Sequence, residues 1–397
     1  MKCMASSGRL GRNRSLCVWI AMLNGAPGVI IPGLMPFWQQ EGVSIEQVWL
    51  LQGCFAVTLG LCTVPFGLLA DVRGRKACLF MGITLSALGD VAYLLGHDFW
   101  AFLVAEVCMG AGVALVSGAD SALLYDTLKA LGPEEEKRFA RLAGLGASGC
   151  FILTALGNLG HGWVASFGER VPFCVSAGCA LVQLALLALV TEPVVDKEPR
   201  LVGFGELPRV LAFSLRPGSA QLWLIAAWSV VAVGTWLAVW FYPLSFQLAG
   251  LTPGQQGAVW AFYNCVAGLA AFAARRHTAG TSVASSFIVF VGLTAGAHVL
   301  FGTVVAAWAF LFGALHQVVR GAAPVVFGRA LNELVPSTMR ATVLSVQGAC
   351  ATLAYGCVNL RLGACIELFG FQAVLVVISV ACVATAMLVL SIRQEGS

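Results

Sequence analysis

The sequence predicts an all-α integral membrane protein with twelve transmembrane helices in two pseudo-symmetric six-helix bundles. Three observations lead to this fold class: the composition, the number of long apolar runs and the placement of the basic residues. Of 397 residues, 59% are hydrophobic and only 11% are charged, whereas a soluble protein carries about 25% charged residues. A soluble chain this apolar could not cover its surface with polar groups. The composition therefore excludes a cytosolic enzyme, a nucleic-acid binder and a disordered chain.

Twelve runs of the chain are long and apolar enough to cross a membrane, which takes about 20 helical residues. A charged stretch at 192–220 divides them into two sets of six, and two equal halves are typical of an internal duplication. We therefore expect an N-terminal bundle at 1–191, a cytoplasmic linker at 192–220 and a C-terminal bundle at 221–397. The runs are 15–38, 47–70, 76–96, 99–124, 139–166, 171–191, 221–248, 255–274, 281–301, 303–329, 341–366 and 370–392.

The basic residues predict the orientation, because cytoplasmic loops are enriched in Lys and Arg. With the N-terminus inside, nearly all of the 23 Lys and Arg residues fall in cytoplasmic segments. We expect both termini in the cytoplasm and a multi-pass protein of the cell membrane, with the bacterial inner membrane favoured. The first apolar run follows basic residues, as in a secretory signal, but no A-x-A-like site follows it. Because Pro27, Pro32 and Pro36 interrupt this run, we expect an uncleaved and irregular first helix.

The sequence lacks the motifs of enzymes and metal centres. Its 14 cysteines are scattered through apolar runs without a C-x-x-C pair, so we interpret them as small packing residues and expect no metal and no cofactor. Neither H-E-x-x-H nor G-x-S-x-G occurs, which argues against an enzyme. No G-x-x-x-x-G-K-[ST] loop occurs either, which excludes ATP as the direct energy source.

The loop between the second and third runs carries the most specific motif, GLLADVRGRK at 67–76. It resembles the G-x-x-x-D-[RK]-x-G-[RK]-[RK] signature of the major facilitator superfamily, except that Val72 replaces a basic residue. The alternative is an ordinary positive-inside loop with turn glycines. The resemblance implies the twelve-helix fold, and it implies that the loop's Asp and Arg pair with an acid at the end of the fourth span. Asp126 is the acid at that position, or else a solvated loop acid. The predicted cytoplasmic gate motif is Gly67, Asp71, Gly74, Arg75 and Asp126.

Two acidic residues lie inside the fourth span, where an ionised side chain costs about 2.5–3.5 kcal/mol. At 100° per residue, Glu106, Ser117 and Asp120 fall on one helix face. We expect Glu106 and Asp120 to carry protons, because the neutral form of a carboxyl group is much cheaper in a membrane than the ionised form. Drug-antiporter members of the superfamily usually have an Arg near the position of Glu106, so this chain departs from their pattern.

The resemblance also implies which residues line a central cavity, because spans one, four, seven and ten surround it in the superfamily. The alternative for the aromatic residues and Asn24 is helix packing, and for Glu106 and Arg320 it is a static ion pair. The expected cavity residues are Asn24, Ser117, Trp228, Thr235, Trp236, Asn264, His316 and Arg320.

We therefore expect a proton-coupled secondary active transporter that works by alternating access. Export of an amphipathic compound, as a proton antiporter, is favoured because aromatic side chains and few fixed charges suit loosely specified cargo. The alternative is proton-coupled uptake of an anionic metabolite, with Arg320 as the anchor. A membrane-embedded enzyme or a sensor is the alternative from a different class. The expected partners are the lipid bilayer, a small-molecule substrate and protons, with no nucleic acid, and the protein is expected to act as a monomer.

Overall fold

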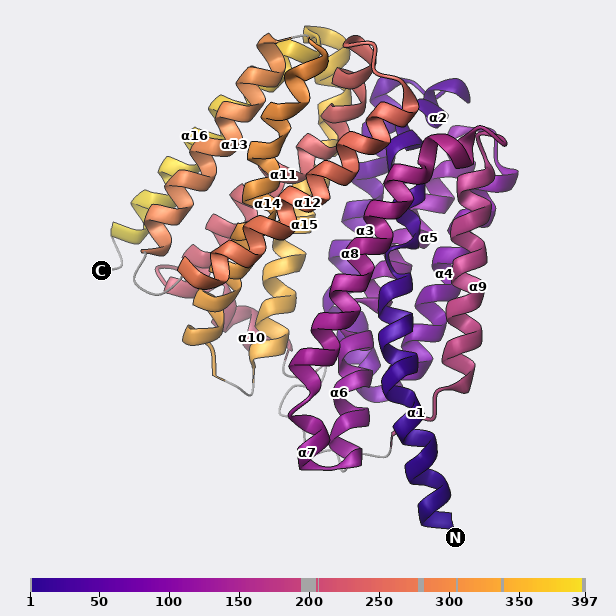
Figure 1. Ribbon diagram of the computed structural model, residues 1–397. Helices are drawn as coiled ribbons and strands as arrows, with labels where there is room; N and C mark the ends of the chain where they lie inside the picture. The colour runs from indigo at the N-terminus through magenta and orange to yellow at the C-terminus, as the bar shows by residue number, and fades with distance from the viewer. Residues whose placement is uncertain are drawn as a thin grey trace. The chain divides into compact units, whose positions relative to one another are not determined.

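The computed structural model describes residues 2–193, 205, 207–277, 282–304, 306–336 and 339–394, and their side chains except at 2–9, 275–277 and 392–394. Residues 194–204 of the predicted linker lie outside this part of the chain. Throughout the described ranges the regular structure is helical (Figure 1), and twelve helical segments are long and apolar enough to cross a membrane. The predictions of an all-α fold and of twelve spans are therefore confirmed.

The chain forms two compact units, and the boundaries between them fall inside a helix and within the stretch predicted as the linker. The first unit contains Met1–Leu34 and Leu61–Arg200, and the second contains Met35–Gly60 and Leu201–Ser397. Helix α3 (Ile45–Arg73) contributes to both units. The remaining helices of the first unit are α1 (Lys2–Leu23), η1 (Ala26–Val29), η2 (Ile31–Gly33), α4 (Arg75–Leu95), α5 (Phe99–Val116), α6 (Ala119–Leu131), α7 (Pro133–Glu136), α8 (Phe139–Ala165) and α9 (Val171–Leu189).

The second unit contains the helices from α10 onward. Helix α2, which begins at Leu34, also falls almost wholly within it. Its other helices are α10 (Leu207–Ser214), α11 (Ala220–Leu248), α12 (Pro253–His277), α13 (Val283–Thr303), η4 (Ala307–Ala309), α14 (Phe310–Leu334), α15 (Arg340–Phe369) and α16 (Phe371–Gln394). Its core packs Trp223, Phe287 and Phe327 around α11, α13 and α14.

The fourth span of the first unit is broken at two residues. Helix α5 ends at Val116, and α6 begins at Ala119. Between them Gly118 has a φ of 79°, a left-handed conformation that favours glycine because a Cβ atom would be strained there. The sequence predicted one continuous helix over 99–124, so this prediction is wrong at the break. The 100° periodicity that placed Glu106 and Asp120 on one face does not continue through it.

Helices α4 and α5 pack closely because two glycines face each other. A Cβ atom at Gly112 would lie 2.7 Å from the carbonyl oxygen of Gly82, and one at Gly82 would lie 2.8 Å from the carbonyl oxygen of Gly112. Backbones that approach this closely are typical of small residues in membrane helices. This contact holds the α5 side of the break against α4, and so fixes one wall of the cavity described below.

A larger side chain at Gly112 should destabilise the first unit, because the opposing carbonyl oxygen of Gly82 and backbone nitrogen of Ser86 cannot move aside cheaply. We expect Gly112→Val to cost about 1–3 kcal/mol and to lower the midpoint of thermal unfolding in detergent. The matched control is Gly178→Val, since Gly178 in α9 is exposed and has no atom within 4 Å of its Cβ position. Equal melting of both variants would contradict the packing argument.

Candidate functional site

A cavity of about 440 Å³ lies inside the first unit, between α1, α4, the α5–α6 break and α9. This volume is within the range of sites for small ligands. Its apolar lining includes Ile83, Val113 and Val116. The polar side chains that line it are Asn24, Ser86, Asp90, Ser117, Asp120, Ser176 and Gln183. The first unit therefore places carboxyl, amide and hydroxyl groups together among apolar residues.

Asp120 is bound in this cavity by neutral groups. Its Oδ2 accepts a hydrogen bond of 3.3 Å from Nδ2 of Asn24, and its Oδ1 accepts one of 2.6 Å from the backbone N–H of Ser121. Nε2 of Gln183 donates to Oδ1 of Asn24 at 2.8 Å and to the carbonyl of Ile20 at 3.0 Å, which fixes the orientation of the Asn24 amide. Among the described residues, no Lys or Arg forms an ion pair with Asp120. The charge of this carboxyl group is therefore not neutralised by a fixed cation of that region.

Asp90 is a second carboxyl group that lines the same cavity. It is 2% exposed, and its Oδ1 has no hydrogen-bond partner in the described part of the chain. Ser176 of α9 also lines the cavity. From the sequence, Asp90 is a further polar candidate, and the alternative is a side chain that reaches the interface from near the end of a span.

Glu106 lies elsewhere in the first unit, packed between helices. It is 3% exposed, and its carboxylate accepts a hydrogen bond from the hydroxyl of Tyr93 on α4. The Tyr93 ring stacks on Phe102 and Phe173, with centroid distances of 5.4 Å and 4.7 Å. Glu106 is not among the residues that line the cavity of Asp120. The two acids predicted for proton coupling therefore lie in different surroundings.

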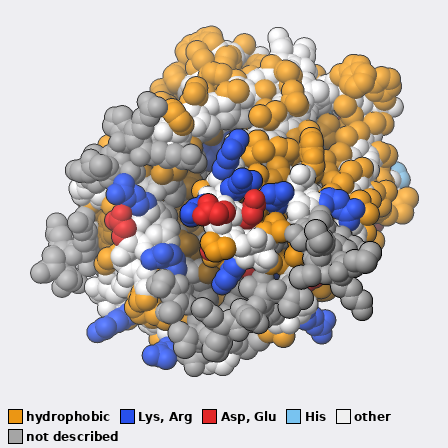
Figure 2. Space-filling view, turned by 60° about the horizontal axis from the view of Figure 1, so that its bottom comes forward, with side chains coloured by type: hydrophobic (Ala, Val, Ile, Leu, Met, Phe, Trp, Pro, Cys, Tyr) orange, Lys and Arg blue, Asp and Glu red, His pale blue; other side chains and the backbone are white. Residues whose placement is uncertain are grey.

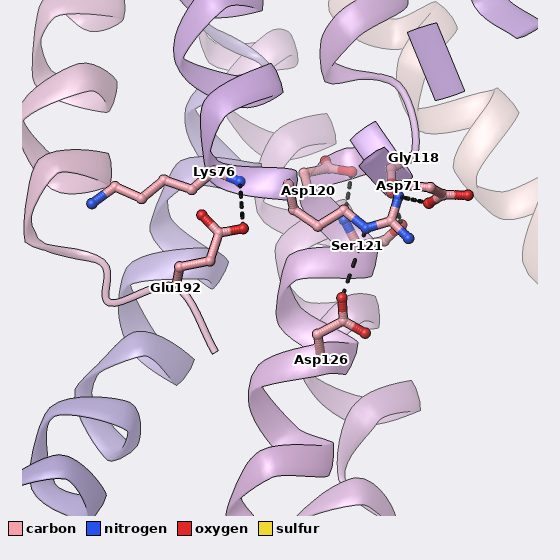
Figure 3. A network of polar contacts seen from close by, with 8 residues as sticks. Asp71, Lys76, Gly118, Asp120, Ser121, Asp126 and Glu192 are labelled. Carbon is pink, nitrogen blue, oxygen red and sulfur yellow. Dashed lines mark hydrogen bonds and ion pairs between the residues drawn. The ribbon is translucent and has the colours of Figure 1, made fainter. Parts of the chain in front are cut away.

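The structure brings together three residues of the predicted gate motif. Nη1 of Arg75 lies 2.6 Å from Oδ1 of Asp71, and Nε of Arg75 lies 3.7 Å from Oδ2 of Asp126 (Figure 3). The three side chains are only 14–24% exposed. Because screening by water is weaker at such positions than on an open surface, these ion pairs are stronger than fully solvated ones. The guanidinium of Arg75 thus joins the end of α3 to α6.

The two glycines of the predicted gate motif lie in different environments. Gly74 has a φ of 99°, and a Cβ atom there would lie 2.7 Å from Oε1 of Glu192. The same oxygen accepts a hydrogen bond of 3.4 Å from the backbone N–H of Lys76 (Figure 3), at the positive end of α4. The sequence did not indicate this role for Glu192. By contrast, no atom lies within 4 Å of a Cβ position at Gly67.

In the second unit, the half-buried Arg320 and the buried His316 each contact further polar groups. Nη2 of Arg320 donates to Oδ1 of Asn264 at 2.5 Å, and no acid pairs with Arg320 among the described residues. Nδ1 of His316 lies 3.0 Å from the hydroxyl of Tyr242, and its Nε2 lies 3.2 Å from the carbonyl of Thr294. Asn264 and Arg320, both predicted to line the cavity, are therefore in contact.

The remaining predicted residues of this unit take part in packing. The rings of Trp228 and Trp236 meet edge to face at 6.3 Å, and Trp236 also meets Tyr355 at 5.8 Å. The Thr235 hydroxyl donates to the carbonyl of Val231 in its own helix at 3.0 Å. His298, which the sequence reasoning missed, is fully buried with its ring 4.5 Å from that of His316.

Charged residues gather at one end of the helices. Figure 2 shows Lys and Arg side chains, with several Asp and Glu, on the face that it brings forward. In the first unit this end includes α7 and the beginning of α1 (Figure 1).

Among the described residues, no group of three or more His, Cys, Asp or Glu side chains could hold a metal ion.

Comparison with known proteins identifies the kind of molecule. The family model of the Major Facilitator Superfamily matches residues 17–314. Quinolone resistance protein NorA of Staphylococcus aureus strain MRSA252 is 23% identical over 173 residues, 44% of this chain and 42% of that protein. Multidrug resistance protein 2 of Bacillus subtilis strain 168 is 29% identical over 174 residues, 43% of this chain and 40% of that protein. The chain thus spans less than half the length of these relatives.

Solved transporters share the fold over nearly the whole chain. The nucleoside transporter NupG (D323A mutant) superposes with a TM-score of 0.77 at 12% identity, and covers 96% of this chain and 99% of its own. The D-xylose–proton symporter superposes with a TM-score of 0.69 at 16% identity, and covers 97% of this chain and 98% of its own. The family match indicates a membrane transporter and not an enzyme, and these likenesses show the shared fold.

Loss of the carboxylate at Asp71 should weaken the link between α3, α4 and α6. We expect Asp71→Asn to shift the balance between inward-facing and outward-facing states by about fivefold, which corresponds to about 1 kcal/mol for an ion pair near the surface. The measurement is the distance distribution between spin labels, one in each unit. Glu134→Gln is the matched control, because it removes an exposed pair with Lys137 in which both side chains are more than 70% exposed. If the distances are unchanged in Asp71→Asn, Asp71 is a charged loop residue without influence on the conformational balance.

Proposed function

Since this chain belongs to the major facilitator superfamily, we propose that it is a proton-coupled secondary transporter that exports an amphipathic small molecule. In this proposal the protein lies in the cell membrane with both termini in the cytoplasm. Its two units alternate access to a site within the membrane. The gradient of protons supplies the energy, and Asp120 is the group that takes up and releases the proton.

The observation that carries the proposal is the environment of Asp120. A carboxyl group bound by one side-chain amide and one backbone N–H, and by no Lys or Arg among the described residues, can exist in either protonation state. In its neutral form it can donate a hydrogen bond, and in its ionised form it can only accept. The Asn24 amide, held by Gln183, offers a donor to the ionised form.

Coupling follows if the proton and the cargo prefer different states of the protein. Because the ionised form of a carboxyl group is costly in the membrane, its protonation stabilises conformations that bury it more deeply. A ligand can shift a conformational equilibrium only by its difference in affinity for the two states. The Asp71–Arg75–Asp126 contacts, which join three helices, provide a second element whose making or breaking accompanies the change of state.

Export is favoured by the lining of the cavity and by the relatives. The cavity combines apolar side chains with a few polar groups, as expected for loosely specified amphipathic cargo. The two relatives are named for resistance to quinolones and to multiple drugs. A quinolone is therefore the first cargo to test.

Replacement of Asp120 by Asn should separate cargo movement from proton movement, because an amide keeps the shape but cannot take up a proton. In proteoliposomes with an imposed pH gradient, we expect Asp120→Asn to reduce the rate of uphill quinolone transport at least tenfold. Without a gradient, we expect the variant to retain the exchange of quinolone across the membrane. Glu106→Gln measures the part played by the other proposed coupling group, which lies outside the cavity. Glu169→Gln, at an exposed position, is the matched control. Uphill transport by Asp120→Asn at the wild-type rate would contradict this role.

A second candidate function, proton-coupled uptake of an anionic metabolite, is supported by Arg320. The half-buried guanidinium of Arg320 keeps its charge, and among the described residues it donates a hydrogen bond to the neutral amide of Asn264. An anionic cargo would provide the missing charge, and it would bind the fork of the guanidinium through two hydrogen bonds.

Two substitutions at Arg320 distinguish the candidate functions. If an anion binds there, Arg320→Lys should weaken its affinity about tenfold or more, because an ammonium group cannot form the same pair of hydrogen bonds. Arg320→Gln should abolish the binding. The measurement is the thermal stabilisation of the purified variants by a panel of mono- and dicarboxylates. If carboxylates stabilise the wild type and both variants equally, the uptake function has no support from Arg320.

A further inference from the structure

A groove of about 610 Å³ lies between α1 and α8 in the first unit, apart from the cavity of Asp120. One end of the groove is formed by arginines and the rest by apolar side chains. Its lining therefore changes from charged to apolar along the helices. This pattern matches a molecule with a charged head and an apolar chain.

The charged end contains three guanidinium groups and one carboxylate. Nη1 of Arg14 lies 2.7 Å from Oε2 of Glu135, and Nη1 of Arg138 lies 3.2 Å from Oε1 of the same residue. Glu135 thus holds Arg14 and Arg138 beside each other, although it can neutralise only one of them. Arg141, one turn further along α8, is exposed and also lines the groove. The charged end of the groove therefore carries a net positive charge.

The apolar part of the groove is formed by exposed residues of two membrane-spanning segments. Trp19 of α1 is 58% exposed, and Leu145 of α8 is 51% exposed. Met22 continues the same wall one turn beyond Val18. Large apolar side chains that a membrane protein leaves exposed within its spans are in contact with lipid chains, and Trp is enriched at the level of the headgroups.

We propose that this groove binds one anionic phospholipid of the leaflet into which the arginines project. The phosphate lies between Arg138 and Arg141, and an acyl chain lies along Trp19 and Leu145. Basic pockets between transmembrane helices are suited to anionic headgroups, and each Lys or Arg near the surface contributes a favourable charge interaction. A neutral lipid would leave the excess charge unpaired, and a free phosphate would leave the apolar wall unused. This site is independent of the transport function proposed above.

The position of Trp19 allows the lipid to be detected directly. The full chain is placed in phosphatidylcholine bilayers that contain increasing fractions of phosphatidylglycerol with brominated acyl chains, because bromine quenches tryptophan fluorescence on contact. The difference between the wild type and Trp19→Phe isolates the signal of Trp19. We expect brominated phosphatidylglycerol to quench this signal at a lower mole fraction than brominated phosphatidylcholine does. Equal quenching by the two lipids would overturn the proposal without any variant of the binding residues.

Removal of the arginines should abolish the preference for the anionic lipid. We expect Arg138→Gln and Arg141→Gln each to reduce the preference about fivefold. The matched control is Lys137→Gln, which removes an exposed charge from the same segment but does not line the groove. An equal loss in Lys137→Gln would show a general surface charge instead of a site. Displacement of the lipid by millimolar glycerol phosphate would show a site for soluble phosphates, and would also overturn the proposal.

Discussion

A carboxyl group inside a membrane must either give up its charge or find donors that stabilise it, and the first unit is arranged around this constraint. Asp120 lies just after a helix break, where the backbone of Ser121 and the amide of Asn24 reach its two oxygens. The break depends on Gly118, whose left-handed conformation allows α6 to begin with a new axis. The cavity lies beside this break, next to the part of α5 that packs on α4.

The same physical requirement accounts for the contrast between the two acids of the fourth span. Glu106 precedes the break and packs on Tyr93 among aromatic rings, whereas Asp120 follows it and lines the cavity. A proton carrier must be reached by protons, so a carboxyl group that lines a cavity is better suited to the task than one enclosed by side chains. In the second unit, the half-buried Arg320 is a cation inside a span, and it donates a hydrogen bond to the neutral Asn264.

The spans and the contact between Asp71, Arg75 and Asp126 could be predicted from the sequence, because long apolar runs and a loop motif are local signals. The break at Ser117–Gly118 could not be predicted. Small residues such as these also occur inside continuous transmembrane helices, so they do not interrupt the apolar run that predicts the span. The contacts of Asn24 with Gln183, and of Gly74 with Glu192, join residues more than a hundred positions apart. Such contacts depend on how helices pack, and no periodicity within one helix indicates them.

The central claim is that Asp120 takes up and releases a proton within its cavity, and infrared difference spectroscopy of the purified protein tests it without knowledge of the cargo. A protonated carboxyl group has a carbonyl stretching band that its ionised form lacks. The account predicts that such a band grows as the pH is lowered in the wild type, and that one component of it persists in Glu106→Gln and is missing in Asp120→Asn. A band that is unchanged in Asp120→Asn would contradict the account.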